Sequence, residues 1–395
     1  MSESPSNPPP VGSVPPKPGG TSIARILVIA VGLAGVAGAA FGVVYYQNKD
    51  VPPVDTMKAL KSAVTEVDRY SKLDPAYTDA NGDLIADEPK DAAKFVNPAE
   101  LTFTTVVFDD ADKAEQIWKP FLDHLAQTTG KKVTYLKRVP GAPPASAPAP
   151  APKKEEGEDS PPPGDPYALN AINEQLAAVR EGKLHVTAFS TGSVTQAVST
   201  AGFVPLFVPA DVTGTFAYEM EIIVPAASPV QKPEDLKGKA IAFTGMSSNS
   251  GAKAPLVTLK EEFNLLPDRD YSFVFSGDHR HSIRDVAAGK VAAACVANDI
   301  LGQMIAAGEV KADAFRSIYK SKPFPPVCFG VPVTLEPGLK ASIRKAFETF
   351  NMAGTSVGER YKAQKRVKFV PVDYKKDFGY VREVDAKLSK FFEAK

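Results

Sequence analysis

A short polar stretch, Ser247 to Gly251, stands where a β-prone run gives way to a predicted helix. A helix N-terminus has unpaired N–H groups and carries about half a positive charge, so it attracts anions. The hydroxyls of Ser248 and Ser250 and the amide of Asn249 add donors, and Gly251 lets a ligand approach the backbone. Simple N-capping needs only one such residue. The stretch therefore either caps a helix or holds an anion.

A histidine pair follows in the next strand-end loop, "SGDHRHS". His279 and His281 are two residues apart, and no neighbouring carboxylate or thiol motif completes a zinc site. His279 is either a further hydrogen-bond donor to an anion or an ordinary loop histidine. We interpret His281 as an ordinary loop histidine.

A glycine-containing loop, "DANGDLIAD", carries acidic and amide side chains at near-alternate positions. Oxygen ligands at this spacing suit a hard cation such as calcium, although Gly82 is misplaced for an EF-hand. The alternatives are a calcium site and a plain solvated turn. The calcium ligands would be Asp79, Asn81, Asp83 and Asp87.

Composition excludes several classes of function. Lys plus Arg and Asp plus Glu are both 46, so the net charge is zero and a nucleic-acid partner is not expected. Two cysteines, Cys295 and Cys328, are too few for a disulfide scaffold. They either form one disulfide bond or are two separate thiols in the core. The chain has no nucleophile elbow, phosphate-binding lysine loop or catalytic cysteine signature, so we do not expect it to be an enzyme. Calcium is the one cofactor that the sequence suggests.

The N-terminal region predicts a membrane anchor. Residues 1–25 are rich in proline and predict a disordered cytoplasmic tail, and Ile26 to Tyr46 carry no charge. At ~1.5 Å per residue the uncharged run extends about 31 Å, enough to cross a bilayer. Arg25 and Lys17 favour a cytoplasmic N-terminus, which places the rest of the chain in the periplasm or outside the cell. The alternative is a cleaved signal peptide, but the apolar run is longer than usual for one.

From about Asn97, predicted strands and helices alternate, which indicates an α/β fold with largely parallel sheets. Ligands bind such sheets at the carboxyl ends of strands, where the polar loops fall. A proline-rich segment, residues 140–166, has no core to bury and is interpreted as an insertion within one domain.

Several stretches in order resemble the phosphonate and phosphite-binding proteins of ABC importers. They lie between about Leu101 and Phe350 and include "INEQLAAVREGKLHVTAF", "PEDLKGKAIAFTGMSSNSG", "FVFSGDHRHSI" and "SIYKSKPFPP", and it is their combination that is specific. The resemblance implies a bilobal type II periplasmic-binding-protein fold, with two lobes joined by crossover strands. It predicts a stalk at 47–97, lobe I at 98–222, lobe II at 223–330, and a return to lobe I with C-terminal helices at 331–395.

The resemblance also implies a ligand site. The family's S-T-S-G corner corresponds to Ser248–Gly251, and its loop histidine to His279. The first-lobe loop lacks the family's usual aromatic residue, so this contact is either absent or made by another residue, such as Tyr218. The predicted ligand contacts are Thr191, Ser193, Tyr218, Ser247, Ser248, Asn249, Ser250, Gly251, His279 and Asn298.

The predicted function is that of a membrane-tethered protein that binds a phosphorus oxyanion and delivers it to an ABC permease. Members that recognise an amino group often carry an acidic residue after the S-x-P-x-P stretch, where this chain has Val327 and Cys328. Phosphate, phosphite or a phosphonate with a neutral tail is therefore expected. The alternative is an extracytoplasmic sensor that reports the ligand to a membrane partner.

Overall fold

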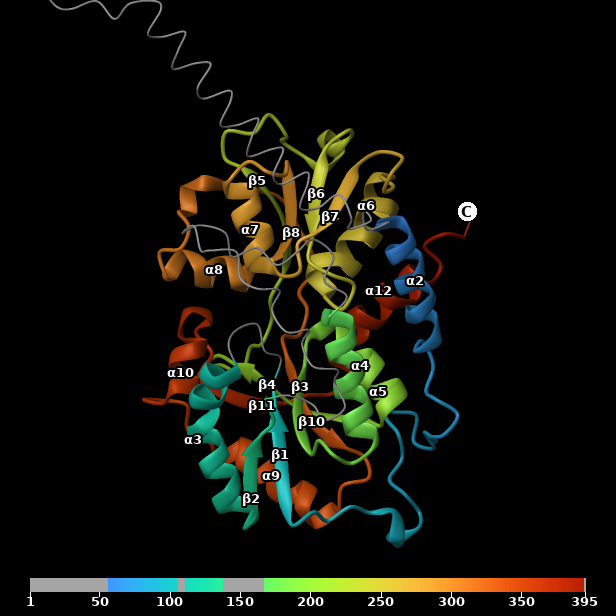
Figure 1. The fold of residues 1–395 in the computed structure, drawn as a ribbon, viewed down its shortest axis with the longest axis vertical. Helices are drawn as coiled ribbons and strands as arrows, with labels where there is room; N and C mark the ends of the chain where they lie inside the picture. Colours follow the sequence, from blue (N-terminus) through green and yellow to red (C-terminus); the bar gives the residue numbers. More distant parts are fainter. Residues whose placement is uncertain (1–55, 106–110, 138–166, 394–395) are drawn as a thin grey trace, which may run out of the picture. The chain divides into compact units, whose positions relative to one another are not determined.

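The computed structural model describes residues 56–105, 111–137 and 167–393, which all belong to one compact unit spanning residues 54–395 (Figure 1). The predicted tail, the predicted membrane span at 26–46 and the proline-rich insertion at 140–166 lie outside the described residues. Within the described ranges, no helix is long and apolar enough to span a bilayer.

The described strands form two sheets, and each sheet defines one lobe. Lobe I contains six strands in the order β11-β4-β10-β3-β1-β2. Their bounds are β1 Glu100–Thr104, β2 Lys132–Tyr135, β3 Val186–Phe189, β4 Phe203–Ala210, β10 Cys328–Pro332 and β11 Lys368–Pro371. Lobe II contains five strands in the order β7-β6-β8-β5-β9. Their bounds are β5 Met220–Pro225, β6 Ala240–Phe243, β7 Ser272–Phe275, β8 Ala293–Ala297 and β9 Phe315–Lys320.

Helices cover both faces of each sheet. In lobe I, α3 and α10 lie on one side and α4 and α5 on the other, whereas in lobe II α7 and α8 lie opposite α6 (Figure 1). The longer helices are α2 Thr56–Arg69, α3 Ala111–Thr129, α4 Tyr167–Arg180, α5 Thr191–Ala201, α6 Ala254–Phe263, α7 His279–Ala287, α8 Asn298–Ala306, α9 Pro337–Thr349 and α12 Gly379–Ser389. The shorter ones are η1 Ala92–Lys94, η2 Pro233–Leu236, η3 Asn249–Lys253, η4 Ala312–Ala314, α10 Ser356–Tyr361, η5 Lys362–Gln364 and α11 Tyr374–Asp377.

The expectation of largely parallel sheets is wrong. In lobe I, β1 pairs in parallel with β2 and β3, but β10 pairs antiparallel with both β3 and β4, as β11 does with β4. In lobe II, β6 is parallel to β7 and β8, whereas β5 is antiparallel to β8 and β9. The crossovers account for β5 and β10. Each of these strands enters a sheet from the other lobe and therefore runs against the strands of that sheet's own βαβ units.

The two crossover segments meet between the lobes. Tyr218 and Phe324 exchange both of their backbone hydrogen bonds, at 3.0 and 2.8 Å, in an isolated antiparallel bridge. β5 begins at Met220 and β10 at Cys328, so each strand starts a few residues before the lobe boundaries expected at 222/223 and 330/331. Both cysteines are free and buried in the strands β8 and β10.

Helix α2 is part of the core, although residues 47–97 were expected to form a stalk. Its apolar side chains recur three or four residues apart, and Leu60 and Val67 are 0% and 2% exposed. They join a hydrophobic cluster that includes Phe273 of lobe II and Val198 of lobe I, and α2 packs along α12 (Figure 1). A stalk helix would leave this apolar stripe in water, so burial against α12 and β7 is the more stable arrangement.

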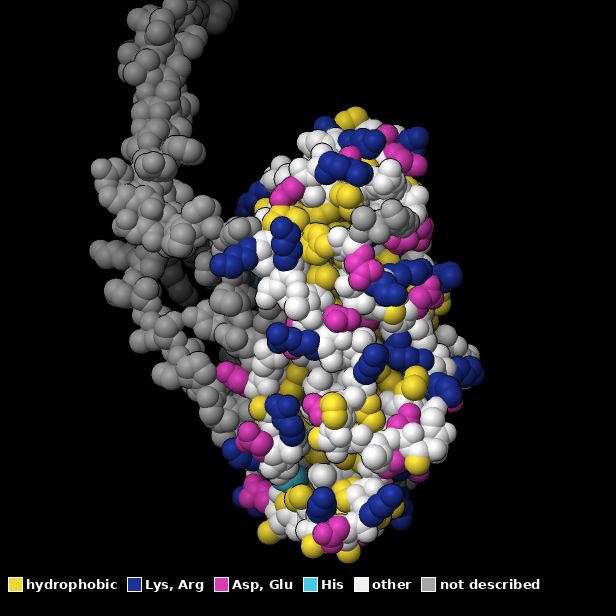
Figure 2. All heavy atoms as spheres, turned by 90° about the vertical axis from the view of Figure 1, so that its right-hand side faces the viewer, with side chains coloured by type: hydrophobic (Ala, Val, Ile, Leu, Met, Phe, Trp, Pro, Cys, Tyr) yellow, Lys and Arg dark blue, Asp and Glu magenta, His cyan; other side chains and the backbone are white. Residues whose placement is uncertain are grey.

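The face that carries α2 shows Lys, Arg, Asp and Glu side chains intermingled over its surface (Figure 2). No large area of one charge stands out on that face, in keeping with the zero net charge of the chain.

Replacing Leu60 with alanine tests whether α2 is integral to the folded unit. Removing a fully buried leucine side chain costs about 2–5 kcal/mol of unfolding free energy. We expect Leu60→Ala to lower the urea midpoint of the main unfolding transition, and Ser62→Ala, on the exposed side of α2, to leave it unchanged. A Leu60→Ala protein with the wild-type midpoint would show that α2 is an independent stalk.

Candidate functional site

The polar corner lies between β6 and α6, where the chain makes a π-helical turn. Ser248 is the N-cap of η3, and its Oγ accepts a hydrogen bond from the Gly251 N–H at 3.0 Å. The Ser248 carbonyl accepts from the N–H of Lys253, five residues on, at 3.2 Å. The corner therefore does cap a helix. Only one of its side chains is used for the cap, which leaves the other polar groups available for another role.

Gly251 is required by the packing of this turn. A Cβ at this position would collide with the Thr244 side chain, whose backbone N–H donates to the Gly251 carbonyl at 3.0 Å. The Asn249 side chain is 1% exposed, and neither its amide nitrogen nor its amide oxygen has a hydrogen-bond partner among the described residues. An unpaired amide in the interior costs free energy, so this side chain is a place where a ligand would gain hydrogen bonds.

His279 faces the corner from the first turn of α7. Its Nδ1 accepts a hydrogen bond from the Ala297 N–H at 3.2 Å, so in the neutral ring the proton is on Nε2. That nitrogen lies 3.3 Å from Ser248 Oγ and 3.5 Å from Ser250 Oγ. Burial lowers the pKa of His279 to about 4, with Asp278 opposing the shift. At neutral pH the imidazole is therefore uncharged and presents one N–H donor to the corner.

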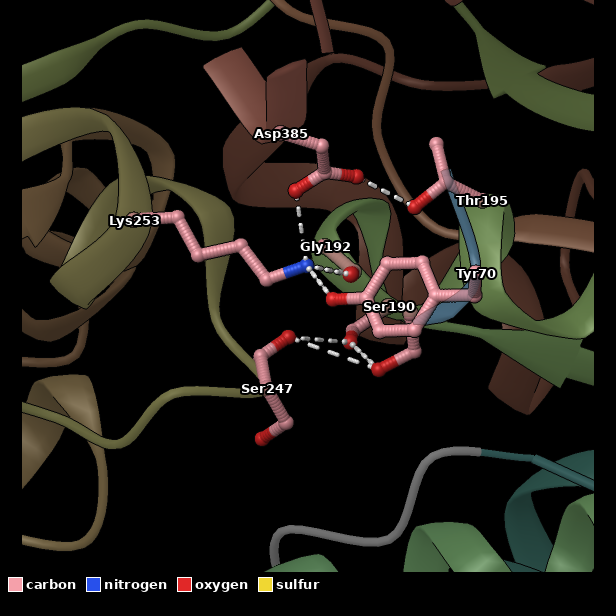
Figure 3. A network of polar contacts seen from close by, with 8 residues as sticks. Tyr70, Ser190, Gly192, Thr195, Ser247, Lys253 and Asp385 are labelled. Carbon is pink, nitrogen blue, oxygen red and sulfur yellow. Dashed lines mark hydrogen bonds and ion pairs between the residues drawn. The ribbon is translucent and has the colours of Figure 1, made fainter. Parts of the chain in front are cut away.

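Lobe I approaches the corner with the N-terminus of α5. Ser190 and Ser193 both direct their hydroxyls to the Ser247 carbonyl oxygen, each at 3.4 Å (Figure 3). A Cβ placed on Gly192 would lie 2.5 Å from that oxygen and 2.6 Å from the Asn249 nitrogen. Only glycine permits this approach, which brings the N-terminal ends of α5 and η3 together.

Three more predicted contacts lie at the crossover. The Tyr218 hydroxyl donates to Thr191 Oγ1 at 3.2 Å, and Thr191 Oγ1 donates to the Pro325 carbonyl at 2.8 Å. Burial raises the pKa of Tyr218 to about 12, so its hydroxyl stays protonated. Asn298 is held by Glu219, whose backbone N–H donates to the amide oxygen at 3.0 Å. Thr191 and Tyr218 thereby tie α5 to the crossover, whereas Asn298 is tied to the chain just before β5.

The predicted calcium ligands do not form a metal-binding cluster. In the described part of the chain, no group of three or more His, Cys, Asp or Glu side chains is placed to hold a metal ion. Both carboxylate oxygens of Asp79 accept from backbone N–H groups within the loop, and one oxygen of Asp87 accepts from Thr78 and Ala80. Asp83 accepts from Ile85 and from the Asn81 amide. Through these hydrogen bonds the carboxylates stabilise the turn.

Sequence reasoning missed a buried ion pair behind the corner. Lys253, the last residue of η3, pairs with Asp385 of α12 at 3.0 Å, and their side chains are 1% and 5% exposed (Figure 3). Lys253 lies among apolar residues in the sequence, and this position was the one signal that could have indicated a buried charge. Its partner, 132 residues away, could not be found from spacing.

A second ion pair links the lobes at the start of α8. Arg366, which follows η5, donates to the Asp299 carboxylate at 3.1 Å, and Gln364 donates to the same oxygen at 3.0 Å. Burial raises the pKa of Asp299 although Arg366 opposes the shift. This contact is one residue from Asn298, so it belongs to the same edge of lobe II as the predicted site.

Comparison with known proteins decides the family. Residues 163–378 match the model of the ABC transporter, phosphonate, periplasmic substrate-binding proteins, which is more than half of the chain. The chain belongs to this family. It is a family of substrate-binding proteins that serve transport, and the corner, His279 and the crossover all lie within the matched residues.

Two solved structures show the same fold. A binding protein component of an ABC phosphonate transporter from Pseudomonas aeruginosa matches with a TM-score of 0.57 and 17% identity, over 75% of this chain and 88% of that one. PhnD1 from Prochlorococcus marinus, in complex with methylphosphonate, matches with a TM-score of 0.55 and 14% identity, over 74% and 100% of the two chains. At these identities the comparison supports the bilobal fold alone.

The low pKa of His279 predicts a direct titration result. The unfolded-state pKa of histidine is about 6.5, so between pH 6.5 and 4 the unfolded chain binds a proton that the folded chain does not. This group therefore lowers stability as pH falls through that window. We expect the ring-proton NMR signal of His279, assigned with a His279→Gln variant, to titrate near pH 4. A midpoint at 6 or above would contradict the buried, neutral ring.

Proposed function

We propose that this phosphonate-family protein binds the oxygen atoms of a phosphorus oxyanion at the corner where the N-termini of α5 and η3 meet. The observation that carries the proposal is the close approach of Gly192 to the corner, which places two helix N-termini from different lobes against each other. Each terminus contributes about half a positive charge and N–H donors, and both interact favourably with an anion nearby.

The side chains at this point supply neutral donors. Ser248 and Ser250 offer hydroxyls, His279 offers its Nε2–H, and the Asn249 amide has unmet hydrogen-bonding capacity. Hydrogen bonds to an anion are stronger than those between neutral groups, so uncharged donors are sufficient for tight binding. Ser247 takes part through its carbonyl, which receives the hydroxyls of lobe I, and Gly251 lets the turn form.

In this proposal Thr191, Ser193 and Tyr218 hold α5 in position for closure, and Asn298 lies at the lobe II rim. The neutral residues after the S-x-P-x-P stretch favour phosphate, phosphite or a phosphonate with an uncharged tail.

Lobe closure around the anion is the hinge motion that a permease would detect. Residues 26–46 would tether the protein to the membrane, which keeps the binding unit near its transporter.

Calorimetric titration of the full-length protein tests the proposed site. We expect tight binding of phosphate, phosphite or methylphosphonate, and weaker binding of aminoethylphosphonate because Val327 and Cys328 stand where relatives that recognise an amino group often carry an acidic residue. The double variant Ser248→Ala, Ser250→Ala removes two hydrogen bonds to a charged group, each worth about 1.5–3 kcal/mol, and should weaken binding about 100-fold or more.

A matched double variant, Ser317→Ala with Ser342→Ala, removes serine hydroxyls from β9 and α9 and should bind like the wild type. Equal binding by both double variants would place the ligand elsewhere. Absence of heat with any oxyanion would contradict the proposed ligand class.

A further inference from the structure

The buried Lys253 ammonium group is held by three acceptors from three different segments. Nζ donates to the Gly192 carbonyl at 2.6 Å, to the Tyr70 hydroxyl at 2.8 Å and to the Asp385 carboxylate at 3.0 Å (Figure 3). An ammonium group has three donors, so its hydrogen-bonding capacity is filled. The Tyr70 ring centroid also lies 5.1 Å from Nζ.

These contacts join the two lobes directly. Lys253 belongs to lobe II, whereas Gly192 is in the first turn of α5 in lobe I. The other oxygen of Asp385 accepts from Thr195 of α5 at 2.6 Å, so α12 holds α5 and Lys253 together. Separating the lobes breaks at least the bond to Gly192, and a buried charge that loses a partner is costly.

Two of the three partners come from outside the part of the chain that matches the family. The match covers residues 163–378, whereas Tyr70 follows α2 and Asp385 lies in α12. Neither residue is placed at the corner where the oxyanion is proposed to bind. The network therefore involves segments on both sides of the matched residues, and its position between the lobes calls for an explanation other than ligand contact.

We propose that Lys253, Asp385 and Tyr70 form a latch that holds the lobes closed. Because Tyr70 directly follows α2, the position of α2 then affects the equilibrium between closed and open lobes. Lys253 acts as a positioning residue, because it fixes the Gly192 carbonyl and with it the N-terminus of α5. The ligand consequence rests on the proposed function, but the effect on closure does not. Displacing α2 would remove the Tyr70 hydroxyl from Lys253 and shift the lobes towards the open state.

Distance measurements by electron spin resonance test the latch in the full-length protein. Spin labels attached through Glu234→Cys in lobe II and Lys345→Cys in lobe I, both exposed, report the lobe separation without ligand. We expect Tyr70→Phe, Asp385→Asn and Lys253→Met each to shift the population towards longer distances. Gly192→Ala, whose methyl group cannot fit in the closed state, gives the open reference, and Gly245→Ala, which has open space, is its control.

Tyr319→Phe is the matched control for Tyr70→Phe, since it removes a hydroxyl bonded to Glu262 within lobe II. A latch variant that is closed only one-tenth as often should bind methylphosphonate about tenfold more weakly. The pair Tyr70→Phe, Lys253→Met should open the lobes no further than Lys253→Met alone, because both remove the same contact.

The outcomes separate the two proposals. Longer distances in the latch variants but not in Tyr319→Phe support the latch, even if no oxyanion binds the wild type, in which case only the proposed ligand fails. Reduced melting temperature with unchanged distances and unchanged affinity would show a purely structural ion pair and overturn the latch.

Discussion

The structure depends on one close approach, that of the Gly192 backbone to the turn at Ser247 and Asn249. A side chain at residue 192 would keep the lobes apart, because its Cβ would overlap the Ser247 carbonyl. With glycine there, the hydroxyls of Ser190 and Ser193 reach that carbonyl and the first turn of α5 faces the first turn of η3. The same contact places the Gly192 carbonyl on the Lys253 ammonium group. Gly192 therefore links the turn at Ser247 and Asn249 to the buried ion pair of Lys253.

The electrostatics of the corner follow from its neutral side chains. The lowered pKa of His279 keeps its imidazole uncharged at neutral pH, and the Lys253 charge is balanced by Asp385 behind the turn. Positive potential at the corner therefore comes mainly from helix N-termini, which are fixed by the backbone and need no reorganisation when an anion arrives. This agrees with a chain whose net charge is zero and whose visible face mixes both signs.

The parts of the site that are local in sequence could be predicted, and the parts made by distant contacts could not. The strand-to-helix corner and the facing histidine follow from turn chemistry and from the rule that ligands gather at strand ends. The direction of β5 and β10 depends on which lobe the chain has just left, and local alternation of strands and helices carries no such information. In the same way, α2 has an amphipathic pattern that fits a stalk or a docked helix equally well, and only its partner α12 decides between them.

The aspartate loop, residues 79–87, also shows that a local sequence pattern does not fix the role of its side chains. Asp79, Asp83 and Asp87 have the residue types and spacing of cation ligands, but the same carboxylates can accept backbone N–H groups of the turn. In the structure they do so, and Lys375 donates to the Gly82 carbonyl of that loop at 2.8 Å. Residue type alone does not distinguish an acceptor for the backbone from an acceptor for a metal.

The most direct test of the central claim is amide NMR during titration of the full-length protein with methylphosphonate. If the anion binds at the corner where the two helix N-termini meet, the amide signals of Gly192 in lobe I and of Ser250 and Gly251 in lobe II shift together in one saturable step. Shifts confined to one of the two lobes, or signals at both positions that remain unchanged while the ligand binds, would contradict the account.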